Sequence, residues 1–523
     1  MRQTYLRHWS LFTTLLIYCV VTSISIFLVL QRNHGIWVYP LDDTYIHMAI
    51  AKHAVQNGVW GVIRYEFSSA TSSPVWTALI AVGFWLSGIH EIIPLLMTVG
   101  CSIFVIVVAY HVLRRYVKNQ WFIVIALFVC MFGITLTLQT ITGMEHILHL
   151  LGVLIFVDLV IEVLRSTANT YHYGAILLLA ALLPIIRFES LFLLAWSGFI
   201  LLMQKRWRFV ALLSVCAAIP ITVYGLWSQA HGWHFLPNSV LLKGNFADRS
   251  VLGFITSLGQ PIVNSLANDI RLEQSSLAML FILTVVAWTY ARKSVRDERL
   301  TLITIFLLTL LSHLQFASVG WLFRYEAYFV GLGIILIACI GYELWQAKKI
   351  RNSILAVLMI IPFLWRGFFA LTMPTHATRN IYQQHYTMAH FVQRYYPDAR
   401  IAINDIGAVG FYSDAFIMDL FGLSTLATAN ERINNDYYTD DIERIATHKQ
   451  IQIALVNPYW FQPQGGLPPT WTVVGTWHML NYPLVGNREL VFYAVQPQAA
   501  AELRQHLAEF APNLPPDVVQ ELP

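Results

Sequence analysis

The stretch of sequence that decides the fold runs from Tyr39 to Trp76 and reads YPLDDTYIHMAIAKHAVQNGVWGVIRYEFSSATSSPVW. It follows an apolar segment near residues 9–30, so the acidic pair Asp42 and Asp43 stands where the chain leaves a membrane. Two adjacent carboxylates repel each other and are costly to desolvate, so neutral residues would be the ordinary choice at this place. The pair therefore predicts a functional site at a membrane surface.

The composition is that of a membrane protein with several spans. Of 523 residues, 57% are hydrophobic and 12% are charged, whereas soluble proteins carry about 25% charged residues. The net charge of +4 is small and no block of Lys or Arg occurs, which excludes nucleic acid as an expected partner. The five cysteines fall in apolar segments without metal-site spacing, so we expect neither a disulfide framework nor a zinc site.

Apolar stretches long enough to cross a bilayer, about 20 residues each, occur about eleven times. They lie near residues 9–30, 92–113, 120–140, 147–165, 173–187, 189–203, 208–228, 277–291, 300–319, 326–345 and 353–372. The first lacks an A-x-A-like cleavage site, which favours a retained signal anchor. Basic residues cluster at alternate ends of the spans, so the N-terminus is predicted inside and the C-terminal part outside. The sequence thus predicts a multi-pass protein of the inner (plasma) membrane with its acidic pair on the extracytoplasmic side.

The first outer loop, residues 31–90, contains an apolar run that is too short to cross. Ser73 and Pro74 are typical of a helix start, and Gly88 of a helix end. The run between them holds about 15 residues at ~1.5 Å rise each, too short for a bilayer. We therefore predict a helix over residues 74–88 that lies in the outer interface.

A second interfacial helix is predicted from Asp43 to about Asn57, with Asp43 as its N-cap and Gly58 as its end. The predicted fold class is thus an α-helical polytopic membrane domain, residues 1–372, whose first outer loop carries two interfacial helices.

Residues 373–523 are more polar and change pattern. Short strand-like runs occur at Arg400–Asn404 and Ile451–Asn457, and a helical pattern covers Gln383–Tyr396. These features predict a small extracytoplasmic α/β domain with a loose tail after about Pro512.

The motifs resemble a known superfamily. An Asp-Asp-x-Tyr-Ile-His motif after the first span, followed by Ser-Ser-Pro-Val-Trp-Thr, resembles the first outer loop of GT-C integral-membrane glycosyltransferases, which use polyprenyl-phosphate sugars. Further matches follow in the same order along the chain: Gly143–Glu145, Arg187–Glu189, Leu236–Ser239 with Lys243, Asn404–Ala408 and Asp419–Leu423. The set is similar to bacterial arabinofuranosyltransferase and mannosyltransferase-like members. The chain lacks the Trp-Trp-Asp motif of oligosaccharyltransferases, and its Asp-Asp motif differs in surroundings from that of lipid A aminoarabinose transferases, so the sugar stays open.

The resemblance implies an inverting transfer from a polyprenyl-phosphate sugar to an extracytoplasmic glycan, lipid or protein, with membrane lipids around the enzyme. In such a transfer the acceptor hydroxyl loses a proton, and the leaving phosphate must be neutralised. The resemblance places the general base on Asp42 or Asp43. The alternative is that Asp43 only caps the following helix while Asp42 faces water.

Further candidate residues for substrate binding are His47, Glu145, His146, Arg187, Glu189, Asn238, Lys243, Arg324 and Glu326. The cations suited to the leaving phosphate are Arg187, Lys243 and Arg324, with Lys243 slightly favoured over Arg187; each could instead form a structural ion pair. His47 could bind phosphate or hold a carboxylate, or it could simply be solvated. An Asp/Glu/His set could hold a divalent cation, although no tight ligand spacing supports one. The turns at Asp405 and Asp419 read as structural or as facing the acceptor.

Two rival functions remain. A secondary transporter would use its ionisable residues as a substrate path, but the sequence shows no half-to-half symmetry. A non-catalytic protein of the same fold would bind a lipid-linked sugar without transferring it.

Overall fold

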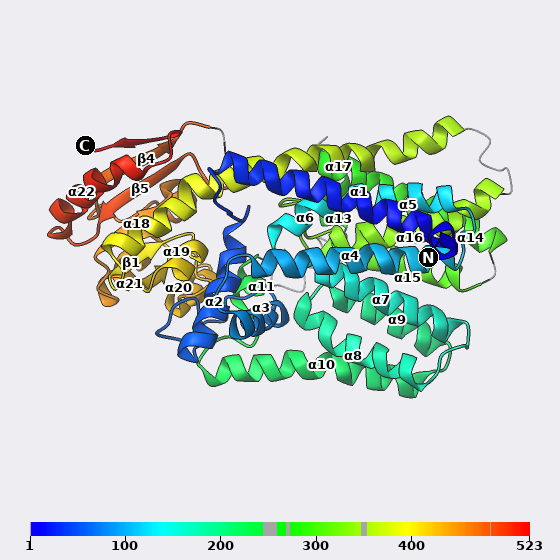
Figure 1. The fold of residues 1–523 in the computed structure, drawn as a ribbon. Coiled ribbons are helices and arrows are strands. Elements are labelled where there is room, and N and C mark those ends of the chain that lie inside the picture. The colour runs from blue at the N-terminus through cyan, green and yellow to red at the C-terminus, as the bar shows by residue number, and fades with distance from the viewer. Residues whose placement is uncertain (1, 244–258, 268–271, 296, 347–352, 482) are drawn as a thin grey trace. The chain divides into compact units, whose positions relative to one another are not determined.

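The computed structural model describes residues 2–243, 259–267, 272–295, 297–346, 353–481 and 483–523 (Figure 1). The chain forms two compact units. The helical unit comprises Met1–Ile26, Leu95–Val223 and Gly244–Met373, and the sheet unit comprises Phe27–Pro94, Tyr224–Lys243 and Pro374–Pro523. The sheet unit therefore groups the acidic loop, residues 33–92, with the C-terminal domain, residues 374–523. The domain boundary at residue 372 stays a prediction.

The helical unit is built from helices, and the long apolar ones among them run along a common direction in Figure 1. They are α4 (Ile93–Arg114), α5 (Gln120–Gly133), α6 (Leu136–Thr142), α7 (His146–Leu164), α8 (Thr170–Ile186), α9 (Ser190–Met203), α13 (Gln260–Ala267), α14 (Leu272–Ser294), α15 (Glu298–Phe316) and α16 (Ala327–Gln346). Three more helices belong to both units along the chain: α1 (Arg2–Arg32), α10 (Trp207–Ala230) and α17 (Ser353–Ile381).

Among the described residues, seven helices are long and apolar enough to cross a membrane, and the bent pair α5 and α6 would make eight. The pair bends by 44° next to Thr135, which has a positive φ of 54°. All the predicted spans fall on helices, but α8 and α9 are shorter than a full span. The protein is thus a multi-pass membrane protein, and the number of about eleven spans stays a prediction.

Helix α16 is the centre of the helical unit and is packed by α5, α7, α14 and α15. Two of its glycines permit this close packing. A Cβ on Gly331 would lie 2.9 Å from the Leu150 side chain, and one on Gly333 would collide with the Phe306 ring. Small residues let helix backbones approach each other within apolar surroundings, where dispersion rather than water exclusion holds helices together.

The C-terminal domain contains the predicted α/β fold. In the described residues its sheet has the order β2-β1-β3-β5-β4-β6, in which β1 runs parallel to β2 and β3 and the other pairs are antiparallel. The strands are β1 (Arg400–Ile403), β2 (Phe416–Asp419), β3 (Ile453–Val456), β4 (Thr472–Met479), β5 (Glu489–Ala494) and β6 (Val518–Glu521). The helical segments are the π-helix η1 (Tyr382–Tyr386), α18 (Thr387–Tyr395), α19 (Gly407–Tyr412), α20 (Leu426–Ile433), α21 (Thr439–His448), η2 (Pro458–Gln464), α22 (Ala499–Phe510) and η3 (Ala511–Asn513).

The predicted loose tail after Pro512 is wrong. Residues Val518–Glu521 form β6, which pairs with β4 from Met479 to Thr476. Just before it, Asp517 forms an ion pair with Arg379, whose Nε donates to Asp517 Oδ2 at 2.9 Å. The sequence signal for this strand was weak. A short strand at the edge of a sheet is stabilised by pairing with its neighbour, and that pairing is not visible in its own four residues.

The acidic loop carries the two short helices at the predicted places, α2 (Asp42–Asn57) and α3 (Pro74–Ser87). The Ser73 hydroxyl accepts a hydrogen bond from the Trp76 backbone N–H at 3.3 Å and caps α3. Asp43 is not the N-cap of α2, because Leu41 occupies that position in an extended conformation and both aspartates lie in the first helical turn. Helix α2 packs against α3 and α19.

Candidate functional site

Asp42 is held by backbone N–H groups at the start of α19, the helix that follows β1 within the sheet unit. The backbone N–H of Gly407 donates to Asp42 Oδ2 at 2.7 Å, and that of Ala408 donates to Oδ1 at 2.8 Å. A Cβ on Gly407 would lie 2.9 Å from the Asp42 carboxylate carbon and would collide with the Asp42 backbone oxygen. Only glycine allows this approach. The carboxylate of Asp42 therefore fastens the acidic loop to the C-terminal domain.

His385 lies between two carboxylates in the same unit. Its Nδ1 is 3.5 Å from Asp42 Oδ1, and its Nε2 is 3.6 Å from Asp405 Oδ2. The His385 side chain is 4% exposed and stands in the π-helix η1, a rare element that is frequent at functional sites. Within the described part of the chain, neither ring nitrogen has a hydrogen bond of ordinary geometry. Asp42, His385 and Asp405 bring three ligand-type atoms within 4.8 Å of one another, so these residues could hold a metal ion.

The electrostatic field at this cluster favours a positive charge. Burial acts most strongly on the pKa of His385 and lowers it, but the carboxylates of Asp405, Asp42 and Asp43 outweigh burial and raise the pKa to about 9. Burial raises the pKa of Asp405; His385 opposes that shift, and the charges of Asp42 and Asp43 add to it. Asp43 thus contributes to the negative potential here, one position after Asp42 in the first turn of α2.

The cluster lies at the edge of the sheet where the parallel strands end. Open α/β sheets bind ligands at the carboxyl ends of their strands. Asn404 orders this edge, because its Nδ2 donates to Asp405 Oδ2 at 2.6 Å and its Oδ1 accepts from the Asn457 N–H at 3.0 Å. Asp419, at the end of β2, instead accepts backbone N–H groups of the loop that follows, from Phe421 at 2.7 Å. We infer that Asp419 is structural, whereas Asp405 belongs to the cluster.

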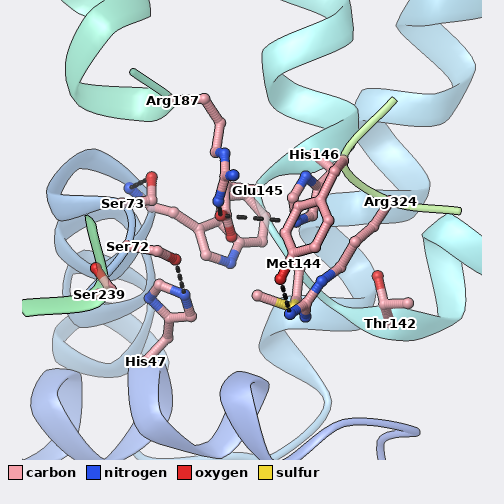
Figure 2. A network of polar contacts seen from close by, with 12 residues as sticks. His47, Ser72, Ser73, Thr142, Met144, Glu145, His146, Arg187, Ser239 and Arg324 are labelled. Atoms are coloured by element: carbon pink, nitrogen blue, oxygen red, sulfur yellow. Dashed lines mark hydrogen bonds and ion pairs between the residues drawn. The ribbon is translucent and has the colours of Figure 1, made fainter. Parts of the chain in front are cut away.

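His47 lies on α2 and is buried among hydroxyl groups of the acidic loop. Its Nδ1 is 2.7 Å from Thr77 Oγ1, and its Nε2 is 3.4 Å from Ser72 Oγ, the contact drawn in Figure 2. These bonds join α2 to the start of α3. They favour a role for His47 in positioning the loop over direct binding of phosphate.

Asn238 begins the short helix α11 (Asn238–Lys243) and is also buried. Its Nδ2 donates to the Gly422 carbonyl at 3.0 Å, and its backbone N–H donates to the Ser69 carbonyl at 3.0 Å. Asn238 therefore joins the acidic loop to the C-terminal domain. The side chain of Lys243, favoured above as the phosphate partner, lies outside the described residues.

In the helical unit, Arg187 is shared by two carboxylates. Its Nη1 donates to Glu145 Oε1 at 3.1 Å (Figure 2). Arg187 also forms an ion pair with Glu189. His146 Nε2 lies 3.8 Å from the same Glu145 oxygen. The structure thus brings four predicted residues together and favours the ion-pair alternative for Arg187.

Arg324 follows a turn of unusual backbone conformation. Trp321, Leu322 and Phe323 have φ angles of 48°, 61° and 60°, and non-glycine residues in this left-handed region are strained. Arg324 Nη1 lies 2.9 Å from Met144 Sδ, drawn in Figure 2, and its guanidinium carbon is 4.9 Å from the centre of the Tyr325 ring. A strained turn persists only where other contacts compensate for its cost in free energy, and such turns are often found at functional sites.

Glu326 is held by a partner that the sequence did not suggest. Arg366 on α17 donates to Glu326 Oε1 at 2.9 Å, and both side chains are 0% exposed. The Gly320 N–H donates to Glu326 Oε2 at 2.8 Å. This buried pair anchors the strained turn to α17, so Glu326 fits a structural role.

Sequence reasoning missed His385, and it interpreted Asp405 as a structural or acceptor-facing turn residue without placing it in a cluster with Asp42. The Asn-Asp-Ile-Gly turn after a strand was a visible signal for Asp405. For His385 there was no sequence signal, because the residue stands in a run with an ordinary helical pattern. A π-helix changes which residues share a face, so that pattern does not predict where the His385 side chain points.

Comparison with known proteins shows the fold. Residues 379–493 match a family described as a domain of unknown function (DUF8728), and no curated protein matches the chain. ArnT from Cupriavidus metallidurans bound to undecaprenyl phosphate matches with a TM-score of 0.55 and 12% identity, covering 94% of this chain and 99% of ArnT. The same ArnT in the apo state matches with a TM-score of 0.53 and 13% identity, covering 93% and 98%.

The oligosaccharyltransferase of Archaeoglobus fulgidus, in complex with Zn and sulfate, matches with a TM-score of 0.53 and 13% identity, covering 92% of this chain and 73% of that one. At such identities the likeness is one of fold. It confirms a helical membrane fold like that of ArnT over nearly the whole chain. Membership of the GT-C superfamily and the arabinofuranosyl- or mannosyltransferase-like subfamily stay predictions.

Proposed function

We propose that the protein is an inverting glycosyltransferase that moves a sugar from a polyprenyl phosphate to an extracytoplasmic acceptor. The observation that carries the proposal is the acidic pair at the start of α2, of which Asp42 is held by the first N–H groups of α19, in a fold shared with ArnT. The undecaprenyl phosphate bound to ArnT supports the class of donor. The sugar and the choice among glycan, lipid and protein acceptors stay open.

Within this proposal, Asp43 is the general base and Asp42 positions the loop. Both oxygens of Asp42 already accept backbone N–H groups, which is the geometry of a tether. The acceptor O–H proton would pass to the Asp43 carboxylate as the acceptor oxygen attacks the anomeric carbon. The bond from that carbon to the phosphate oxygen breaks, and the polyprenyl phosphate leaves with inversion and without a covalent enzyme intermediate.

The leaving phosphate requires a cation, and we propose Arg324 for this role. Arg187 is already shared by Glu145 and Glu189, so its charge is more than balanced. Arg324 follows the strained turn and offers a planar guanidinium suited to phosphate. Lys243 remains a second candidate.

The two aspartates can be separated by experiment. Membranes containing Asp43→Asn, Asp42→Asn or the control Asp440→Asn, which changes an exposed aspartate on α21, are incubated with a panel of radiolabelled polyprenyl-phosphate sugars. Loss of a general base costs about 10²- to 10⁴-fold in rate, so Asp43→Asn should lose transfer while keeping the folded amount and donor binding of the unchanged protein. Asp42→Asn should lower both folded amount and transfer.

The rival functions give other outcomes in the same membranes. A transporter would show solute uptake that these variants abolish, without sugar transfer. A non-catalytic protein would bind one of the donors and transfer none. Equal transfer by Asp43→Asn and the unchanged protein would remove Asp43 as the base.

A further inference from the structure

Asp42, His385 and Asp405 form a buried set of oxygen and nitrogen ligands that the proposed transfer does not use. The residues come from three places in the sheet unit: the start of α2, the π-helix η1 and the turn between β1 and α19. With one atom taken from each residue, the ligand atoms lie within 4.8 Å of one another. His385 is almost fully buried and points between the two carboxylates.

The two distances from His385 to its carboxylates are longer than those of direct charge-assisted hydrogen bonds. A protonated imidazole would donate to a carboxylate at about 2.7–2.9 Å, yet its two nitrogens are 3.5 and 3.6 Å from the facing oxygens. Two ligands at ~2.0–2.2 Å from one tetrahedral ion lie roughly 3.4 Å apart. Because the carboxylates face different ring nitrogens, one carboxylate must move toward the other when an ion binds.

The surroundings orient the ligands as the outer shell of a metal site does. The N–H groups of Gly407 and Ala408 fix the Asp42 carboxylate, and the Asn404 amide fixes Asp405. Each carboxylate oxygen keeps a second lone pair, so these bonds leave room for coordination. Outer-shell hydrogen bonds of this kind commonly set ligand orientation in metal sites.

We propose that Asp42, His385 and Asp405 bind one divalent transition-metal ion of the Zn²⁺ or Mn²⁺ class. A mixed set of one imidazole and two carboxylates suits these ions better than Ca²⁺, which takes oxygen ligands. The ion fastens the acidic loop to the C-terminal domain and balances two buried carboxylates. This role goes beyond the proposed transfer and does not require it.

The test uses the full chain, purified in detergent without chelators. After dialysis against Zn²⁺ or, separately, Mn²⁺, the metal content is measured by mass spectrometry and thermal unfolding is recorded with and without the ion. We expect about one ion for each folded chain, since a single ligand set is proposed, and a rise in the unfolding midpoint that saturates with ion concentration.

Matched variants locate the site. His385→Asn and Asp405→Asn should lose the bound ion, whereas His448→Asn and Asp440→Asn, which change exposed residues of α21, should keep it. Asn404→Ala leaves all three ligands in place and should weaken binding about 10- to 100-fold. That variant keeps the test decisive even where a ligand variant fails to fold.

Three results would overturn the proposal: no ion bound to the unchanged protein with either metal, unchanged binding in Asn404→Ala, or equal binding in ligand and control variants. The first would leave His385 as a protonated bridge between the carboxylates. Asp43→Asn should keep the ion while losing transfer, so failure of the metal site and failure of the transfer proposal are separate results.

Discussion

Two clusters in this protein place a basic side chain between two carboxylates. The basic residue is an arginine in one cluster and a histidine in the other. In the helical unit Arg187 is shared by Glu145 and Glu189, whereas in the sheet unit His385 lies between Asp42 and Asp405. A guanidinium keeps its charge at all ordinary pH values. An imidazole gives up its proton and becomes a metal ligand. The comparison teaches that the arginine cluster keeps a fixed positive charge, while the charge of the histidine cluster depends on whether the imidazole carries its proton.

The largest effect is expected from removing the permanent cation. Arg187→Gln leaves the fully buried Glu145 without the guanidinium that balances it, and breaking a buried pair in this way costs about 3–5 kcal/mol. The free energy of unfolding in mixed detergent micelles measures the loss. The double variant Arg187→Gln with Glu189→Gln should recover part of it. A loss of stability below about 1 kcal/mol, the range of exposed ion pairs, would show that Arg187 does not act as a buried, permanently charged partner of Glu145.

A smaller effect is expected where the histidine cluster meets the backbone. Gly407→Ala pushes a methyl group against Asp42 and should cost about 1–3 kcal/mol by overpacking. It should also speed protease cleavage of the acidic loop at Arg64. The control is Gly174→Ala in α8, where an added Cβ meets no described atom within 4 Å and stability should hold or rise slightly. Equal cleavage rates in the two variants would show that Asp42 is not a tether.

The smallest effect concerns the partly exposed pair Arg379 and Asp517. Burial raises the pKa of Asp517, but hydrogen bonds from Arg379 and Gln383 together with the charge of Arg379 lower it, and the net pKa is lowered. The stabilisation is therefore complete above the unfolded pKa of about 3.9 and is lost as the pH falls through the lower folded value. The protection of β6 against hydrogen exchange, relative to the rate of an unfolded chain at each pH, should show this loss between about pH 5 and about pH 2 in the unchanged protein. In Asp517→Asn the amides of β6 should exchange faster at pH 6, and their exchange should depend less on pH. If this variant showed the same pH response as the unchanged protein, the response would belong to another titrating group.

Local signals in the sequence predicted much of the fold. Ser73, Pro74 and Gly58 fixed the ends of α2 and α3 because caps and left-handed glycines act within a few residues. The spans followed from apolar length alone. The prediction that Asp43 is the N-cap was wrong by two positions. Leu41, in an extended conformation, is the N-cap, although a leucine side chain cannot accept the capping hydrogen bond that an aspartate could.

The candidate site was only partly predictable. The acidic pair and the turn at Asp405 were visible, but their meeting depends on contacts between residues more than 360 positions apart, such as Gly407 and Asp42. The π-helix that turns His385 toward them has no known sequence pattern of its own. Arg366 was hidden inside an apolar span, and its pairing with Glu326 required the packing of α17.

The separation of 365 positions between Asp42 and Gly407 also affects how the protein is made. A ribosome adding about 5–20 residues each second needs roughly 20–70 s to pass from one to the other. During that interval the face of α2 that α19 later covers has no partner from the C-terminal domain, and Asp42 waits without the amides that will hold it. Assembly of this part of the molecule therefore has to wait until residue 407 has been made. A chain that ends before residue 407 would carry its two aspartates without the support that the finished protein gives them.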